Sequence, residues 1–203
     1  MITLYHAPRS RSSMIVWLLE ELGQPYRIEL TPIIYGDGSG SHAPESYRAI
    51  HPHKKVPAID HDGVTVFECA GIAAYLADRF PQANLAPKPD DPTRGLYASL
   101  MAYWAGPLNA IPTAHMSGWD KEKPTGFGSF EDMEAFLEKT IARADPWIFG
   151  KTFSATDVLY AAALNFYMMF NLLPKKPVYV DYAARANDRA AAKLAQERDN
   201  GLN

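Results

Sequence analysis

Residues 50–81 carry the pattern that most constrains the fold: two short apolar runs, a tight turn between them, and then a helix. Val56–Asp60 and Val64–Phe67 are rich in apolar and β-branched residues, with Asp62 and Gly63 between them. This pair tolerates the positive φ of a two-residue hairpin turn, so the segment predicts an antiparallel hairpin. Apolar side chains then recur at helical spacing up to Pro81, which ends the predicted helix: Ile72, Tyr75, Leu76 and Phe80.

Two features of this stretch are unusual for residues with a purely structural role. Pro57 opens a hairpin strand although it has no N–H for the ladder, and a cis bond after Val56 is one way to leave the Val56 backbone free. Glu68 and Cys69 stand where the second strand becomes the helix. The first N–H groups of a helix attract a carboxylate, and the charge of Glu68 attracts an ammonium group. This corner therefore suits the zwitterionic head of an amino acid or a γ-glutamyl peptide.

The first fifty residues add a β-α-β unit in front of the hairpin. Ile2–His6 and Tyr26–Leu30 are predicted strands, and the helix between them begins at residue 12 or 13. A crossover of this length implies parallel strands. Pro44–Ala49 is a candidate short helix. The resulting order, β-α-β-α-β-β-α, is that of a thioredoxin-like domain.

The signals change after the hairpin and its helix. We therefore predict a thioredoxin-like domain over residues 1–82, a polar, proline-containing linker over 83–91, and an all-helical domain over 92–203. The fold class is thus α/β followed by all-α.

Two stretches stand out in the helical half. Ser154 and Asp157 have the spacing of a capping box, with Asp in place of Glu. The helix that they open, Asp157–Phe170, is apolar on nearly all sides, which is typical of a central buried helix. The Ala-rich stretch Tyr182–Arg198 is predicted to be helical.

The composition limits the class of partner. The 203 residues carry a net charge of −3 without a long charge run, so nucleic acid is not an expected partner. The longest apolar tract, Val158–Phe170, is too short for a bilayer, which needs about 20 residues. No apolar segment of a secretory signal is visible at the N-terminus, and the single Cys69 fits a reducing compartment. We therefore expect a cytoplasmic protein without a membrane partner.

The segments Lys54–Ile59 (KKVPAI) and Phe67–Pro81 (FECAGIAAYLADRFP) resemble, in order and spacing, the glutathione-binding half of the cytosolic glutathione S-transferase family, with its bacterial theta-, zeta- and beta-like members. The resemblance extends over essentially the whole chain. It implies a thioredoxin-like N-terminal domain, an all-helical C-terminal domain and glutathione as co-substrate. The glutathione contacts that it implies are Lys55, Val56, Pro57, Glu68 and Cys69, with His42 as a further candidate.

In this pattern the backbone of Val56 pairs with the cysteine of glutathione, Lys55 meets its glycine carboxylate, and Glu68 and Cys69 hold its γ-glutamyl end. Cys69 departs from the family, whose members usually carry Ser or Thr there. Cys at this position keeps the backbone N–H, but its thiol forms a weaker hydrogen bond than the hydroxyl of Ser or Thr. Each residue also has a structural alternative. Glu68 can simply stabilise the N-terminus of the helix through its charge, and Cys69 can be a small buried apolar residue.

A transferase must favour the thiolate, because a free thiol with a pKa of about 8.5 is mostly protonated at neutral pH. A hydroxyl donor, a helix N-terminus and a nearby cation each stabilise a thiolate. The segment Pro8–Ser13 (PRSRSS) offers all three, and the family places its activating residue in this turn. Alignment with the zeta- and theta-type patterns selects Ser10 as the activating residue. Ser12 is the second candidate. Arg11 is the third, because it stands where beta-type members carry their activating Cys. Helix capping is the structural alternative for each serine, and Met14 stands where many members carry Arg.

The resemblance places the pocket for a small hydrophobic electrophile on the first helix of the second half and the residues after it: Tyr103, Trp104, His115 and Met116. Core packing is their structural alternative. The family's usual assembly predicts a homodimer, and its usual role is detoxification. Two alternatives to a transferase remain open, a glutathione-dependent disulfide reductase and a non-catalytic glutathione-binding protein of the same fold. No metal is expected, because no acid or thiol at ligand spacing completes the histidines around residue 51.

Overall fold

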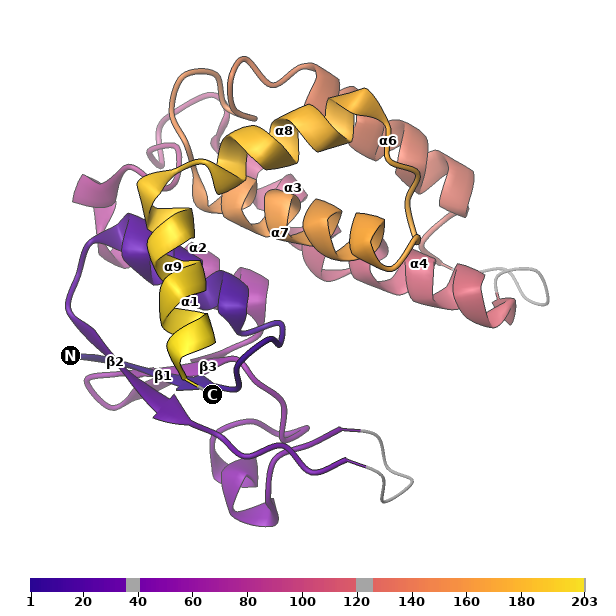
Figure 1. Ribbon diagram of the computed structural model, residues 1–203. Coiled ribbons are helices and arrows are strands. Elements are labelled where there is room, and N and C mark those ends of the chain that lie inside the picture. Colours follow the sequence, from indigo (N-terminus) through magenta and orange to yellow (C-terminus); the bar gives the residue numbers. More distant parts are fainter. Residues whose placement is uncertain (36–40, 120–125, 203) are drawn as a thin grey trace. The chain divides into compact units, whose positions relative to one another are not determined.

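The computed structural model describes residues 1–35, 41–119 and 126–202, and its elements group into two compact units (Figure 1). The first unit comprises Met1–Ala83 together with Ala190–Asn203, and the second comprises Asn84–Arg189. The C-terminal segment thus belongs with the N-terminal residues. This differs from the predicted division, in which all of residues 92–203 formed one helical domain.

The first unit is built on a four-stranded sheet with the order β2-β1-β3-β4. Strand β1 is parallel to β2 and antiparallel to β3, and β3 pairs with β4 as the predicted hairpin. Strand β3 begins at Ala58 rather than Val56, because Pro57 has no N–H to give to the ladder. The other strands have their predicted bounds: β1 (Ile2–His6), β2 (Tyr26–Leu30) and β4 (Val64–Phe67), with β3 over Ala58–His61.

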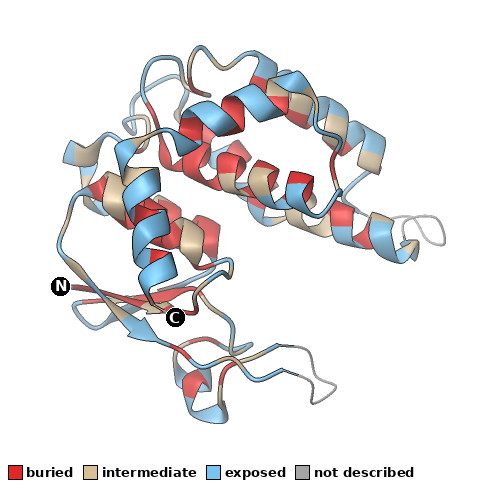
Figure 2. Cartoon of the chain, viewed as in Figure 1, coloured by how far each residue is buried: buried red, intermediate tan, exposed pale blue. Residues whose placement is uncertain are grey.

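Helices cover one face of this sheet (Figure 1). They are α1 (Ser13–Leu22) and α2 (Cys69–Arg79), and α9 (Ala190–Gly201) packs against α1. Short 3-10 turns occupy η1 (Glu45–Ala49) and η2 (Pro81–Ala83). Helix α1 is buried on nearly all sides over residues 15–19 (Figure 2), because it packs against the sheet, α2 and α9. A second, smaller apolar cluster contains Tyr47 and Ala58, with Tyr5 and Val56 packed against it.

Helix α9 belongs to the first unit through its packing against α1. Arg198 places its Nε 2.7 Å from Glu20 Oε1, and its guanidinium lies 5.6 Å from the centre of the Tyr26 ring. The stretch 182–198 is helical, as predicted, except at Asp188 and Arg189. These two residues separate α8 (Pro177–Asn187) from α9, and the break follows the low helix propensity of Asn and Asp.

The second unit is helical throughout its described elements: α3 (Arg94–Ala105), α4 (Pro107–Ser117), α6 (Phe130–Ala142), α7 (Ala155–Met169) and α8. Helix α7 is buried along most of its length, which confirms the predicted central helix. The predicted capping box is also present, because Asp157 Oδ2 accepts hydrogen bonds from the Ser154 N–H at 2.8 Å and the Ser154 hydroxyl at 2.6 Å. Within the described residues, none of the helices combines the length and the apolar character needed to cross a bilayer.

Candidate active site

The turn between β1 and α1 begins with an unusual backbone conformation. Arg9 has a φ of 56°, in the left-handed region, and its N–H donates to Asp199 Oδ2 at 3.0 Å. For a residue other than glycine this conformation costs about 1–3 kcal/mol and is typical of functional sites. The reversal at Arg9 brings the serines that follow it close to the end of β1.

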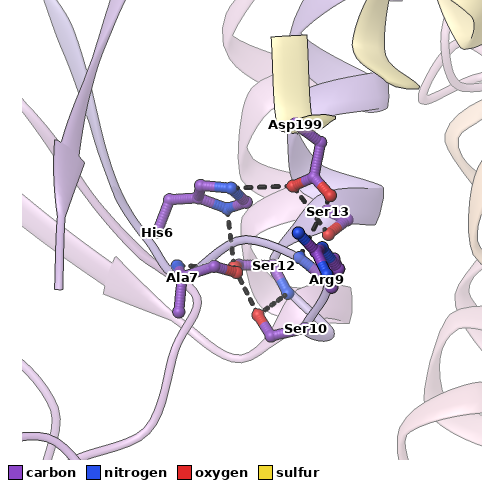
Figure 3. Close-up of polar contacts among 7 residues, drawn as sticks. All are labelled: His6, Ala7, Arg9, Ser10, Ser12, Ser13 and Asp199. Atoms are coloured by element: carbon purple, nitrogen blue, oxygen red, sulfur yellow. Dashed lines mark hydrogen bonds and ion pairs between the residues drawn. The ribbon is translucent and has the colours of Figure 1, made fainter. Parts of the chain in front are cut away.

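Ser10, Ser12 and His6 form a continuous line of polar contacts in this turn (Figure 3). Ser10 Oγ lies 2.7 Å from Ser12 Oγ and accepts the Ser12 backbone N–H at 3.1 Å. Ser12 Oγ lies 2.7 Å from His6 Nδ1, and it also accepts the Ala7 N–H at 3.2 Å. Ser12 is fully buried, whereas Ser10 is partly exposed. Of these two hydroxyls, that of Ser10 is the one a bound molecule can reach.

His6 connects this line to the last helix. Neighbouring residues on a strand point to opposite faces, so Tyr5 packs against Tyr47 while His6 faces α1 and α9. His6 Nε2 lies 2.8 Å from Asp199 Oδ1, and the same oxygen accepts the Ser13 hydroxyl at 3.0 Å. Burial of the ring lowers the pKa of His6, and the charge of Asp199 only partly opposes this effect. The imidazole is therefore neutral at neutral pH.

Acid should destabilise the chain through His6. The pKa of His6 lies below its value in the unfolded chain, about 6.5, so the unfolded chain binds the proton first as the pH falls and stability is lost. Between roughly pH 7.5 and pH 5.5 the midpoint of urea unfolding should fall further in the wild type than in His6→Gln, whose side chain does not titrate. Equal pH sensitivity of the two proteins would contradict this expectation.

The second part of the candidate site is the corner between β4 and α2. The Val56-Pro57 bond is cis, which confirms the prediction, and the backbone N–H and C=O of Val56 make no hydrogen bond within the described residues. Glu68 has a φ of 68° and a ψ of 131°, again a costly conformation for a residue other than glycine. Its side chain is 69% exposed beside the first N–H groups of α2. One ligand can therefore contact the backbone N–H and C=O of Val56, the carboxylate of Glu68 and the N-terminus of α2.

The contact between Cys69 and the serine turn brings the two parts together. Cys69 Sγ lies 4.0 Å from the carbonyl oxygen of Arg11, so α2 begins beside the turn that carries Ser10. Burial raises the pKa of the Cys69 thiol to about 12, so Cys69 is not itself a reactive thiolate. The side chain of Arg11 is exposed.

The remaining predicted glutathione ligands have contacts of their own in this structure. The Lys55 ammonium donates to the carbonyl of Ser41, and His42 Nδ1 lies 2.9 Å from the carbonyl oxygen of Ala43. The structure also brings His51 to the corner, with its Nε2 3.6 Å from Glu68 Oε1. In the sequence, the pattern around His51 indicates only a candidate metal ligand. No group of three or more His, Cys, Asp and Glu side chains in the described ranges is placed to hold a metal ion.

The predicted electrophile-pocket residues lie in the second unit. Trp104 is buried and its Nε1 donates to the carbonyl of Leu159 at 2.8 Å, which favours its role in core packing. The ring of Tyr103 lies 4.4 Å from that of Phe136. His115 stacks on Phe130 at 4.4 Å, and Met116 is 67% exposed. Their part in electrophile binding stays a prediction.

Comparison with known proteins agrees with this geometry. Residues 4–84 match the family described as "Glutathione S-transferase, N-terminal domain". The match thus places a glutathione S-transferase N-terminal domain at the start of the chain. Glutathione S-transferase 3 of Schizosaccharomyces pombe is 40% identical over 80 residues, which are 39% of this chain and 31% of that protein. Maleylacetoacetate isomerase of Rattus norvegicus is 26% identical over 141 residues, 66% of this chain and 63% of the isomerase. The matches thus span less than two thirds of either curated relative.

Solved structures of glutathione transferases share the fold over nearly the whole chain. A glutathione transferase homologue from Sulfitobacter, solved with bound glutathione, superposes with a TM-score of 0.74 at 25% identity and covers 98% of each chain. The thioredoxin-like sheet with its helices and the helical second unit therefore match the fold of the glutathione S-transferases.

Two polar residues of the candidate site do not stand out in the sequence. His6 is there only the last residue of a predicted strand, and Asp199 lies just after the predicted helical stretch that ends at Arg198. The position of His6 directly before the serine turn is a signal that could have been used. Asp199 is separated from Ser10 by almost the whole length of the chain, so no local sequence pattern connects the two residues.

Proposed function

We propose that the chain is a glutathione transferase in which Ser10 stabilises the glutathione thiolate for attack on a small hydrophobic electrophile. The observation that carries the proposal is the position of the Ser10 hydroxyl. It is partly exposed, it is fixed by the Ser12 N–H at the start of α1, and it lies in the turn that Cys69 contacts at the start of α2. A donor held in this way needs little reorganisation when the thiolate forms.

We propose that glutathione binds at the corner between β4 and α2 that carries Glu68. The free backbone of Val56 suits the main chain of the glutathione cysteine, with Pro57 fixing the turn before β3. Glu68 faces the ammonium of the γ-glutamyl group, and the N–H of Cys69 faces its carboxylate. Lys55 is assigned to the glycine carboxylate, with His42 as a further candidate next to Ser41, whose carbonyl accepts the Lys55 ammonium. The Sulfitobacter homologue was solved with bound glutathione, which supports glutathione as the ligand.

Removal of the Glu68 charge should weaken glutathione binding. In Glu68→Gln the loss of a charged partner for the ligand ammonium is expected to cost about 1.5–3 kcal/mol, which corresponds to about a 10- to 150-fold rise in Kd by calorimetry. Glu29→Gln, which removes an exposed carboxylate on β2 of the same unit, is the matched control and should leave Kd unchanged. An unaltered Kd in Glu68→Gln would remove Glu68 from the site.

The reaction type is decided by comparing substrates. Turnover of a reactive aryl halide with glutathione supports the transferase, whereas turnover of a disulfide alone favours a reductase. Retention on immobilised glutathione without turnover of either favours a non-catalytic binding protein. The match to maleylacetoacetate isomerase adds maleylacetoacetate as a third substrate to be assayed. We further propose that the protein is a homodimer, and sedimentation measures this assembly directly.

A further inference from the structure

A line of polar contacts leads from the exposed side of the β1–α1 turn to a buried carboxylate (Figure 3). Its three successive links, Ser10 to Ser12, Ser12 to His6, and His6 to Asp199, measure 2.7, 2.7 and 2.8 Å. Ser10 is partly exposed, and the other members are buried. We propose that this line takes up the thiol proton of glutathione as the thiolate forms, with His6 as the final acceptor. The inference rests on the proposed function of Ser10.

The direction of each hydrogen bond follows from the contact between His6 and Asp199. The contact of Nε2 with the Asp199 carboxylate, 2.8 Å long, lacks the angle of a hydrogen bond, but a carboxylate oxygen at this distance attracts a ring N–H and repels a ring lone pair, so Nε2 carries the hydrogen of the neutral ring. Nδ1 is then an acceptor, and the Ser12 hydroxyl donates to it across 2.7 Å in preference to the carbonyl oxygen of Ala7, which is farther away at 3.1 Å. Because the hydroxyl hydrogen of Ser12 points to His6, Ser12 Oγ acts as the acceptor toward Ser10, and the Ser10 hydroxyl donates to it. Before thiolate formation the hydrogens of both hydroxyls thus point inward, away from the ligand.

Formation of the thiolate reverses these directions in one balanced step. The S–H bond breaks and its proton bonds to Ser10 Oγ. The former Ser10 proton passes to Ser12 Oγ, and the former Ser12 proton passes to His6 Nδ1. The products are a thiolate and an imidazolium, so no proton enters the solvent. The new hydroxyl hydrogen on Ser10 points at the sulfur and is the donor that stabilises the thiolate.

Asp199 alone leaves His6 neutral in the free chain, so the imidazolium of the proposed step depends on Asp199 together with the negative charge of the new thiolate. An isolated buried charge is costly, and a carboxylate 2.8 Å from the ring offsets part of that cost. The carboxylate is itself held by the Arg9 N–H and the Ser13 hydroxyl, each at 3.0 Å. Among the described residues, Asp199 on α9 is the charged group that acts on His6. His6 and Asp199 are therefore positioning residues, which act on the sulfur through two serine hydroxyls.

A purely structural role for these contacts is the alternative, because they also attach α9 to β1 and α1. The ion pair between Arg198 and Glu20, at 2.7 Å, attaches α9 to α1 at a different point. The variant Glu20→Gln therefore weakens the attachment of α9 without altering the proposed path. It is the matched control for both His6→Gln and Asp199→Asn.

The experiment counts protons released when glutathione binds. Calorimetry near neutral pH in buffers of different ionisation enthalpy gives the number released, and ultraviolet absorbance gives the thiolate formed. The wild type should form thiolate with far less than one proton released per thiolate. In His6→Gln and Asp199→Asn the thiolate fraction should fall, and the remaining thiolate should be accompanied by one released proton. Glu20→Gln should give the wild-type ratio.

Other outcomes separate this inference from the proposed function. One proton released per thiolate in the wild type, or an unchanged ratio in His6→Gln, would overturn the proton path while leaving Ser10 as the thiolate donor. Absence of thiolate in the wild-type complex would overturn both. If His6→Gln does not fold, nitrogen NMR of the wild type decides instead. The His6 ring must shift to imidazolium values on addition of glutathione, and a ring that stays neutral beside a formed thiolate would overturn the path.

Discussion

Replacement of Ser10 by alanine should lower kcat/KM for an aryl halide about 100-fold, the typical effect of losing one donor to a developing anion. The hydroxyl of Ser10 is the partly exposed end of the polar line in the β1–α1 turn. Without it the pKa of the bound glutathione thiol should rise toward its free value, about 8.5. Ultraviolet absorbance of the bound thiolate as a function of pH measures this pKa directly.

Two further variants distinguish the effect of Ser10 from that of other serine hydroxyls. Ser46→Ala removes an exposed hydroxyl from η1 in the same unit and should leave the thiol pKa unchanged. Ser12→Ala tests the second-ranked candidate. Because Ser12 is fully buried, its loss should change the thiol pKa only through Ser10 and His6. A normal thiol pKa in Ser10→Ala would show that the activating group is another residue.

Replacement of Asp157 by alanine should lower the free energy of unfolding by about 3–5 kcal/mol, because several buried donors lose their acceptor at once. Asp157 is fully buried at the start of α7. Its carboxylate accepts the N–H groups of Ile148 at 2.9 Å and Ser154 at 2.8 Å, and the Tyr182 hydroxyl at 2.7 Å. Urea unfolding followed by circular dichroism measures the change.

Asp132 provides a matched control for Asp157. It occupies the same position in α6, three residues after the N-cap Ser129, and its Oδ2 accepts the Ser129 hydroxyl at 2.8 Å. This contact is exposed, so Asp132→Ala should cost only about 0.5–1 kcal/mol. Equal losses in the two variants would show that the stability comes from capping alone and not from the buried network around Asp157.

The sequence predicted the hairpin, the cis bond after Val56 and the capping box at Ser154, because each depends on residues within a few positions of one another. It also placed the candidate serines directly before a helix. It misplaced the start of β3 by two residues, where Pro57 interrupts the ladder. It could not rank the serines by accessibility, because burial of Ser12 depends on what packs over the turn.

Local patterns in this chain, such as side-chain periodicity, turn residues and caps, determined the sheet, the principal helices and the corner that carries Glu68. Only the tertiary structure decided that α9 packs on α1 and places Asp199 against His6. The physical reason is distance along the chain. A contact between residues 6 and 199 depends on how two surfaces fit together, and an Ala-rich helix with Asp on one side does not specify which surface will bury it.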